Sequence, residues 1–256
     1  MIIATLHEAG NETRVALTPS SAKHFIKSGF EVSIERNAGL AAGFKDQDYE
    51  QVGVHISEDK KSILTQANVL LCVNEPHPQN LDGLSKNAII VGHIDNDPQG
   101  QLISWCKEKQ LTLFSMNLIP RISRAQSMDS LSSQANLAGY RAVLEASTQF
   151  HRAIPMMMTA AGMIQPAKVL ILGAGVAGLQ AIATAKRLGA VVEVSDIRPE
   201  TKEQVQSLGG KFIEVKGDDS IKIEGGYVKG VSEEFLKRQQ ELVAKHIKEA
   251  DIVITT

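Results

Sequence analysis

The feature that most restricts the fold of this chain is a glycine-rich hexapeptide, Gly173-Ala-Gly-Val-Ala-Gly178. The residues before it, Lys168–Leu172, are mostly apolar, as in a buried strand, and an alanine-rich stretch typical of a helix follows it. In such a strand–turn–helix unit, Gly173 permits the tight turn, Gly175 lets a pyrophosphate approach the backbone, and Gly178 lets helix and strand pack closely. The phosphates would lie at the positive end of the helix. The pattern predicts a Rossmann-type dinucleotide-binding unit, and the alternative is a chance glycine turn.

An acidic residue stands where this fingerprint requires one. Asp196 directly follows a second apolar segment, Val191–Ser195, and lies about 20 residues beyond the glycines. A carboxylate at this place accepts hydrogen bonds from both hydroxyls of an adenosine ribose and repels a 2′-phosphate. We therefore expect NAD rather than NADP as the ligand, a preference that nearby Arg198 weakens slightly. The expected cofactor contacts in this part of the chain are Gly173, Gly175, Val176, Ala177, Gly178, Asp196, Ile197 and Arg198.

Segments typical of strands alternate with segments of helical length along the whole chain. The strand-like segments are Ile2–Leu6, Phe30–Glu35, Val69–Val73, Ile89–Gly92, Leu111–Ser115, Lys168–Leu172, Val191–Ser195, Phe212–Val215 and Ile252–Thr255. This alternation predicts an α/β fold with two Rossmann-like, doubly wound parallel-sheet domains and the cofactor in a cleft between them. We assign residues 1–126 to the first domain, 127–165 to a long connecting helix and linker, and 166–256 to the second.

The connecting segment has a distinct pattern. From Ser127 to about Arg152, apolar and small residues recur at near-helical spacing, which predicts one long helix with a small-residue face that can pack closely against another element. The following residues, 153–166, contain Pro155 and Gly162 and are interpreted as a linker. We expect the Met156–Met158 triplet to fill a core, with a partner surface as the alternative.

Composition excludes several classes of protein. A formal net charge of −2 without any basic run argues against a nucleic-acid-binding surface. The longest nearly apolar stretch, residues 153–164, is shorter than the about 20 residues of a membrane-spanning helix, although a membrane-bound partner stays open. Cys72 and Cys106 have no CxxC spacing, so we expect free thiols in a reducing cytosol rather than a disulfide. No metal is expected.

A second candidate site follows Pro120. Arg121, Arg124, Gln126, Asp129 and Ser132 place polar groups on a loop and the first turns of the predicted long helix. Asp129 and Ser132 are three residues apart and would share one helix face. From the residues alone, a helix start with capping groups and solvated charges is the simpler interpretation.

A resemblance changes that interpretation. The motifs NETRVALTP, PRISRAQSMD, NLAGYRAV, GAGVAGLQAI, DIRPE and EGGYVK extend over the whole chain. The chain resembles the NAD(H)-binding first domain of the alpha subunit of proton-translocating nicotinamide nucleotide transhydrogenase, and PRISRAQSMD is the most specific of these motifs. The resemblance implies that Arg121, Gln126 and Asp129 act at the nicotinamide end, with Ser132 beside them. It also implies that Tyr227 lies on a mobile loop that closes over the bound nucleotide.

The same resemblance implies partners. Hydride would pass directly from NADH to NADP⁺ on a partner domain, while membrane subunits translocate protons. The chain itself would be cytoplasmic, peripheral to the inner membrane of a bacterium through those subunits, and a homodimer. In the family the nucleotide domain continues beyond the strand that ends near Thr256, so we expect the second sheet to be incomplete here.

Two alternatives stay open. Alanine dehydrogenase belongs to the same superfamily, and there a lysine in a KEP-like motif and a later histidine bind pyruvate. In this chain Asn74 takes the place of that lysine, and His93 lies where the histidine would. A neutral amide cannot supply the charge that fixes a carboxylate, so we expect this substrate site to be disabled and His93 to be structural. The other alternative is a non-catalytic NAD-sensing module.

Overall fold

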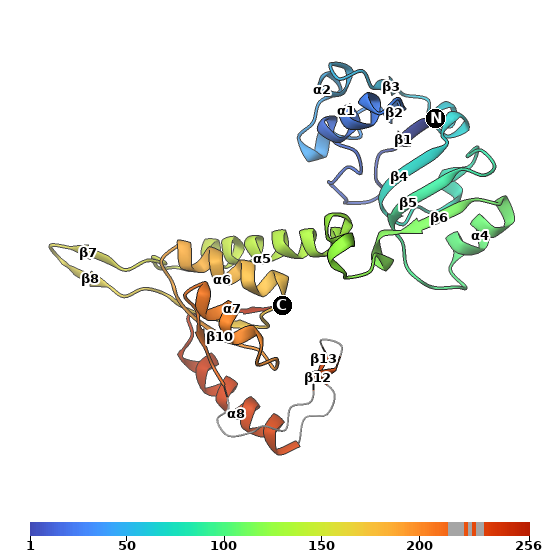
Figure 1. Cartoon of the computed structure of the whole chain (residues 1–256). Helices are drawn as coiled ribbons and strands as arrows, with labels where there is room; N and C mark the ends of the chain where they lie inside the picture. The colour runs from blue at the N-terminus through green and yellow to red at the C-terminus, as the bar shows by residue number, and fades with distance from the viewer. Residues whose placement is uncertain (215–222, 225–226, 229–232) are drawn as a thin grey trace. The chain divides into compact units, whose positions relative to one another are not determined.

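The computed structural model describes residues 1–214, 223–224, 227–228 and 233–256. It divides into two compact units, Met1–Ser130 and Leu131–Thr256, and each is considered by itself (Figure 1). Within the described ranges, no helix combines the length and the apolar character needed to cross a membrane.

The first unit is built on a parallel sheet of six strands in the order β3-β2-β1-β4-β5-β6. The strands are β1 Ile2–Thr5, β2 Glu31–Glu35, β3 His55–Ser57, β4 Val69–Asn74, β5 Ile89–His93 and β6 Thr112–Ser115. The helices are α1 Pro19–Lys27, α2 Asp46–Glu50, α3 Lys60–Gln66 and α4 Gln101–Lys109, with 3-10 turns η1 Leu40–Ala42, η2 Pro78–Leu81, η3 Met116–Leu118 and η4 Ser123–Met128. The strand order reverses between β1 and β4, which confirms the doubly wound prediction.

Local signals determine where the elements of this unit begin and end. The Thr18 hydroxyl accepts a hydrogen bond from Ser21 N at 3.2 Å, and Ser21 Oγ accepts one from Thr18 N at 3.3 Å. This capping box, with Pro19 at the first helical position, starts α1. Cys72 and Cys106 are free thiols, and burial raises the pKa of Cys72 to about 12. An inert, packed thiol is therefore expected at position 72.

The second unit has a parallel sheet of four described strands in the order β11-β10-β9-β14. The strands are β9 Lys168–Leu172, β10 Val191–Ser195, β11 Lys211–Phe212 and β14 Ile252–Thr255, and the helices are α5 Ser130–Gln149, α6 Val176–Arg187, α7 Thr201–Ser207 and α8 Glu233–Glu249. Two short antiparallel pairs complete it, β7 Met157–Thr159 with β8 Gly162–Ile164 and β12 Ile223–Glu224 with β13 Tyr227–Val228. The order again reverses, here between β9 and β14.

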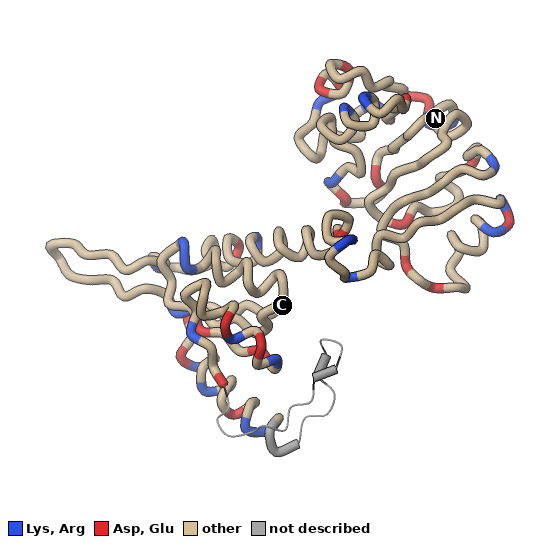
Figure 2. The backbone as a smooth tube through the Cα atoms, in the orientation of Figure 1, with Lys and Arg blue, Asp and Glu red and all other residues tan. Residues whose placement is uncertain are grey.

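The structure confirms the long helix of the segment 127–165 but not the linker. The helix is α5, and it begins at Ser130 rather than Ser127 because the residues before it form the 3-10 turn η4. The expected linker is instead a β-hairpin: β7 and β8 pair, and Gly162, the first residue of β8, has φ +134°. The methionines of this hairpin do not fill a core: Met158 is 77% exposed. Figure 2 shows the hairpin without charged residues.

The small-residue face of α5 packs within its own unit. A Cβ added to Gly139 would lie 2.0 Å from the carbonyl oxygen of Ala177 in α6, so only glycine fits at this helix crossing. Asn136 Nδ2 donates to Gln180 Oε1 at 3.3 Å across the same pair of helices. The predicted close packing of this face is confirmed. Its neighbour is the helix that follows the glycine turn.

Candidate nucleotide-binding site

Two of the three fingerprint glycines are required by the fold itself. Gly173 has φ +103°, and a Cβ there would lie 2.6 Å from Thr256 Oγ1 at the end of the neighbouring strand β14. A Cβ on Gly178 would lie 2.0 Å from the carbonyl oxygen of Gly173. A side chain at either position would therefore push β9, α6 and β14 apart, as the glycine roles predicted.

Gly175 is different. Its φ is −75°, a value open to any residue, and a Cβ there would meet none of the described atoms within 4 Å. It is the N-cap of α6, and no side chain in the described ranges caps this end of the helix. The first N–H groups of a helix lack partners within it and attract negative charge. The space at Gly175 and the uncapped helix end together form a place for a phosphate.

Asp196 closes the site on the side of β10. Its Oδ2 accepts a hydrogen bond from Ala174 N in the glycine turn at 2.6 Å, so the turn and the carboxylate are joined directly. Burial by itself raises the pKa of Asp196, but hydrogen bonds from the Arg198 guanidinium and from the Ala174 and Arg198 N–H groups, with the charge of Arg198, bring the net pKa below its usual value. Asp196 is therefore ionised at neutral pH, as an acceptor for ribose hydroxyls must be.

The residues predicted for the nicotinamide end belong mainly to the first unit. Arg121 follows η3, Gln126 lies in η4 and Asp129 is the residue after η4. Arg121 and Gln126 are exposed, whereas Asp129 is partly buried. Ser132 lies in the first turn of α5, in the second unit. The structure thus brings together Gly173, Gly175, Gly178, Asp196 and Arg198, whereas the roles of Arg121, Gln126, Asp129 and Ser132 stay predictions.

Most of the segment 216–230, which contains Tyr227, lies outside the described residues. The backbone of Tyr227 is part of β13, paired with Glu224 of β12, but its side chain is not among those described. Its role at the nucleotide therefore also stays a prediction.

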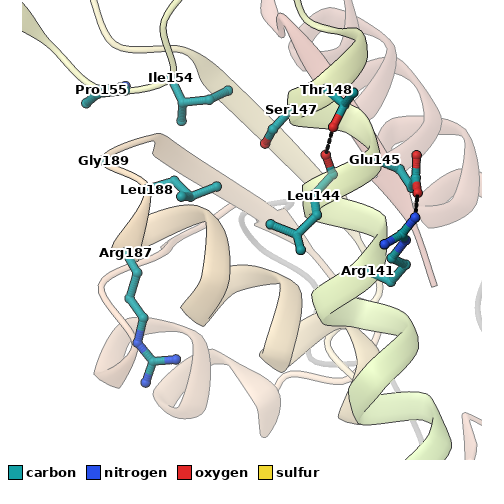
Figure 3. Close-up of a pocket in the computed structure, with 10 residues that line it drawn as sticks. All are labelled: Arg141, Leu144, Glu145, Ser147, Thr148, Ile154, Pro155, Arg187, Leu188 and Gly189. Atoms are coloured by element: carbon teal, nitrogen blue, oxygen red, sulfur yellow. Dashed lines mark hydrogen bonds and ion pairs between the residues drawn. The ribbon is translucent and has the colours of Figure 1, made fainter. Parts of the chain in front are cut away.

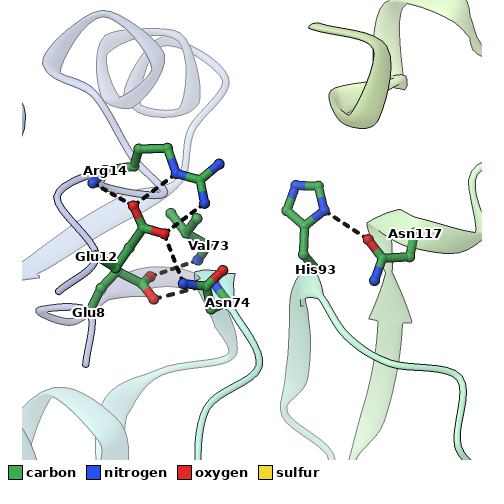
Figure 4. A network of polar contacts seen from close by, with 7 residues as sticks. All are labelled: Glu8, Glu12, Arg14, Val73, Asn74, His93 and Asn117. Atoms are coloured by element: carbon green, nitrogen blue, oxygen red, sulfur yellow. Dashed lines mark hydrogen bonds and ion pairs between the residues drawn. The ribbon is translucent and has the colours of Figure 1, made fainter. Parts of the chain in front are cut away.

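The switch point of the first sheet carries a network of polar side chains (Figure 4). Glu12 accepts hydrogen bonds from Arg14 Nε at 2.8 Å and Nη2 at 2.6 Å, and from Asn74 Nδ2 at 2.8 Å. Glu8 accepts one from Val73 N at 2.6 Å. The side-chain hydrogen bond from Arg14 is the main cause that lowers the pKa of Glu12 to about 2. The carboxylates here are thus occupied by this unit's own donors.

His93, at the end of β5, is bound to a neighbouring side chain. Its Nδ1 lies 2.9 Å from Asn117 Oδ1, and Asn117 Nδ2 donates to the carbonyl of Ile94 at 3.1 Å. Because the amide nitrogen is used for Ile94, its oxygen is the acceptor, and His93 carries its proton on Nδ1. This arrangement supports the structural role expected for His93.

The second unit also has an open groove of about 790 Å³ (Figure 3). Its lining includes Leu144 of α5, Ile154 and Pro155 before the hairpin, and Leu188 after α6. Arg187 and Leu188 place this lining at the carboxyl end of α6. The glycine turn is at the other end of that 12-residue helix, about 18 Å away along its axis. The groove is therefore not the nucleotide site.

Comparison with known proteins places both units in one family. The family model described as "Alanine dehydrogenase/PNT, N-terminal domain" matches residues 5–138, and the corresponding C-terminal domain matches residues 142–256. The chain is 45% identical to an NAD(P) transhydrogenase alpha subunit of Rickettsia prowazekii, covering 100% of this chain and 68% of that protein. It is 47% identical to the corresponding subunit of Rhodospirillum rubrum, covering 96% and 66%.

Solved structures agree. The transhydrogenase from Sinorhizobium meliloti superposes with a TM-score of 0.89 at 46% identity, covering 100% of this chain and 69% of that one. An L-alanine dehydrogenase structure gives a TM-score of 0.72 at 28% identity, covering 83% and 60%. The chain spans about two thirds of the length of the Rickettsia and Rhodospirillum subunits. It belongs to the alanine dehydrogenase/PNT family, and within that family it groups with the transhydrogenase alpha subunits.

Proposed function

We propose that this chain is the NAD(H)-binding component of a proton-translocating transhydrogenase. The observation that carries the proposal is the open position at Gly175, in front of an uncapped helix end and next to the ionised Asp196. The fold explains glycine at 173 and 178 but not at 175, where a bound pyrophosphate would explain it. Asp196 would accept the ribose hydroxyls and disfavour NADP(H).

Direct hydride transfer between two nicotinamide rings depends mainly on how the rings are positioned. When bound, NADH supplies the hydride, which passes to NADP⁺ held on a partner domain. The glycine turn and Asp196 hold the adenosine half, and Gln126 with Ser132 hold the carboxamide or ribose of the other half. Arg121 and Asp129 organise the face that the NADP domain meets. No side chain has to donate or accept a proton in such a step, so these residues act by orientation. Membrane subunits would carry the proton and keep this chain at the membrane surface.

The function is tested by a paired assay. The chain is mixed with a purified NADP-binding domain of a transhydrogenase, and NADH-dependent reduction of bound NADP⁺ is followed; pyruvate plus ammonia with NADH is the second reaction. Transfer without pyruvate amination is expected. Robust amination without transfer would favour an amino-acid dehydrogenase. Tight NADH binding with neither reaction would favour a sensing module.

A second experiment separates binding from transfer. Arg121→Ala, Gln126→Ala and Asp129→Asn should each lower the transfer rate far more than NADH affinity, because they act where the two nicotinamides meet. Arg124→Ala is the matched control, since Arg124 is an exposed arginine of η4 without an assigned role. If all four variants transferred hydride at the same rate, the segment 121–132 would be only the start of a helix, with no role at the nicotinamide.

We also propose that the second unit forms a homodimer. The small-residue face of α5 does not support this, because it packs on α6. The support comes from other exposed apolar residues of α5, where Leu137 is 57% and Tyr140 46% exposed, and from the uncharged hairpin with its exposed methionines. An isolated two-stranded hairpin has little stability in water, and an apolar surface of this kind marks an interface.

The groove argues for a second copy as the occupant. Ile154 and Pro155 line it and directly precede the hairpin, so groove and hairpin are neighbours on one surface. A two-fold interface pairs a surface with itself, which lets each hairpin cover the other copy. Met158→Glu should give monomers in sedimentation velocity, with Lys248→Glu on the polar helix α8 as control. If the unsubstituted chain sedimented as a monomer, the proposal of a dimer would be wrong.

A further inference from the structure

All the hydrogen-bonding positions of Asp196 are occupied in the structure. Oδ1 accepts from Arg198 N at 2.8 Å and from Arg198 Nε at 3.0 Å. Oδ2 accepts from Ala174 N at 2.6 Å and from Arg198 Nη2 at 3.0 Å. A carboxylate offers about four such positions in total. The ribose hydroxyls of a nucleotide would therefore need positions that this chain already fills.

The four donors differ in what holds them. The two N–H groups, of Ala174 and Arg198, belong to the glycine turn and to the backbone after β10, so they stay in place. The other two belong to the Arg198 guanidinium, whose side chain is 31% exposed, whereas that of Asp196 is only 6% exposed. Of the groups around this carboxylate, the guanidinium is the one with solvent to move into.

We propose that Arg198 is a displaceable substitute for the nucleotide: its guanidinium occupies the positions on Asp196 that the adenosine ribose takes, and leaves when NAD(H) binds. This rests on the proposed function as an NAD(H)-binding protein. The device keeps the buried carboxylate paired while the site is empty, which lowers the cost of holding an ionised group there. It also makes the guanidinium an internal competitor of the ligand.

The same pairing affects the choice between NAD and NADP. A freed arginine at this place can accept a 2′-phosphate. While Asp196 is present it both repels that phosphate and binds the guanidinium, so Arg198 gives NADP(H) little help. Without Asp196, the guanidinium would be available to the phosphate. Arg198 should therefore oppose NADH binding in the parent and favour NADPH binding once Asp196 is replaced.

The test is a double-mutant cycle measured as dissociation constants for NADH. Arg198→Ala should tighten NADH binding about two- to tenfold, because a partly exposed charged pair no longer has to be broken. In an Asp196→Ala background, the same substitution should give no gain. Lys202→Ala is the matched control: it removes one positive charge on the neighbouring helix α7, where Lys202 pairs with Glu214 at 2.6 Å, and should leave NADH affinity unchanged.

The dissociation constant for NADPH provides an independent test. In the Asp196→Ala background, replacing Arg198 by Ala should weaken NADPH binding severalfold. Melting temperatures of all variants check that each is folded, and Arg198→Lys, which cannot form the two-pronged contact, should behave like a milder Arg198→Ala. Weaker or unchanged NADH binding in Arg198→Ala would overturn the proposal. Failure of the folded parent to bind NADH would instead overturn the proposed function.

Discussion

The two sheets of this protein share a strand order around their switch points but use those points differently. In the first unit, residues 6–18 connect β1 to α1, and their side chains fill the edge of the sheet with the Glu8, Glu12 and Arg14 contacts. In the second unit, only residues 173–175 connect β9 to α6, and the position in front of Gly175 is open. The same topology thus creates two possible ligand sites, and the connecting loop decides which one can receive a phosphate.

The largest expected effect separates the open glycine from the packed ones. Gly175→Val should weaken NADH binding about 100-fold or more, since a side chain would displace two or more charge-assisted hydrogen bonds to the pyrophosphate. Its melting temperature should stay close to that of the parent, because none of the described atoms lies within 4 Å of the added Cβ. Isothermal titration and thermal melts measure the two quantities.

Gly178→Val is the contrasting variant. It should lower the melting temperature, because its Cβ would overlap the carbonyl oxygen of Gly173 at 2.0 Å. If Gly175→Val bound NADH like the parent, the open position would have no connection with a ligand.

A smaller effect is expected at the acidic residues of the two switch points. Asp196→Ala should weaken NADH binding about 10- to 100-fold, because the charge-assisted hydrogen bonds to the ribose are lost. The matched change in the first sheet, Glu12→Ala, should alter NADH affinity less than about twofold, because its carboxylate serves Arg14 and Asn74. Equal affinities for NADH and NADPH in the parent would contradict the role of Asp196.

The smallest effect is a pH-dependent stability. The pKa of Glu12 is lowered from 4.5 to about 2 in the folded chain. The contribution of its charge to the free energy of unfolding is therefore complete above about pH 4.5 and is lost as the pH falls toward 2. Glu12→Gln should reduce the free energy of unfolding by about 1 kcal/mol at pH 7, a modest value because Arg14 is half exposed and screened. In urea unfolding, the difference in free energy of unfolding between the parent and Glu12→Gln should be smaller at pH 3 than at pH 7. The same difference at both pH values would mean that the charge of Glu12 does not contribute to stability.

The sequence predicted the parts of the fold that depend on local patterns. Lys168–Leu172, Val191–Ser195 and Ile252–Thr255 were expected as strands and are β9, β10 and β14, since a short, mostly apolar run next to a turn leaves little choice. The hairpin was missed because its strands have three residues each and no alternation. Its exposed methionines look like core residues by composition.

The site was predictable where it consists of one short segment and unpredictable where distant residues meet. The fingerprint glycines and Asp196 follow a known spacing, so their neighbourhood could be inferred. The contact between Glu12 and Asn74 joins residues 62 positions apart, which no local pattern indicates. The contact of Arg198 with Asp196 spans only two positions, but it depends on a side-chain rotamer.

The contact between Gly173 and Thr256 has a consequence for folding kinetics. The phosphate-binding turn spans a few consecutive residues, yet Thr256 Oγ1 donates to the Gly173 carbonyl from 83 positions along the chain, and Thr256 N donates to Leu172 O. A contact of such long range forms only after the loop between its ends has closed, which is entropically slow. The glycine turn should therefore be among the last parts of the second unit to become rigid. In refolding experiments NADH should bind only after β14 has docked, and should slow unfolding without accelerating folding.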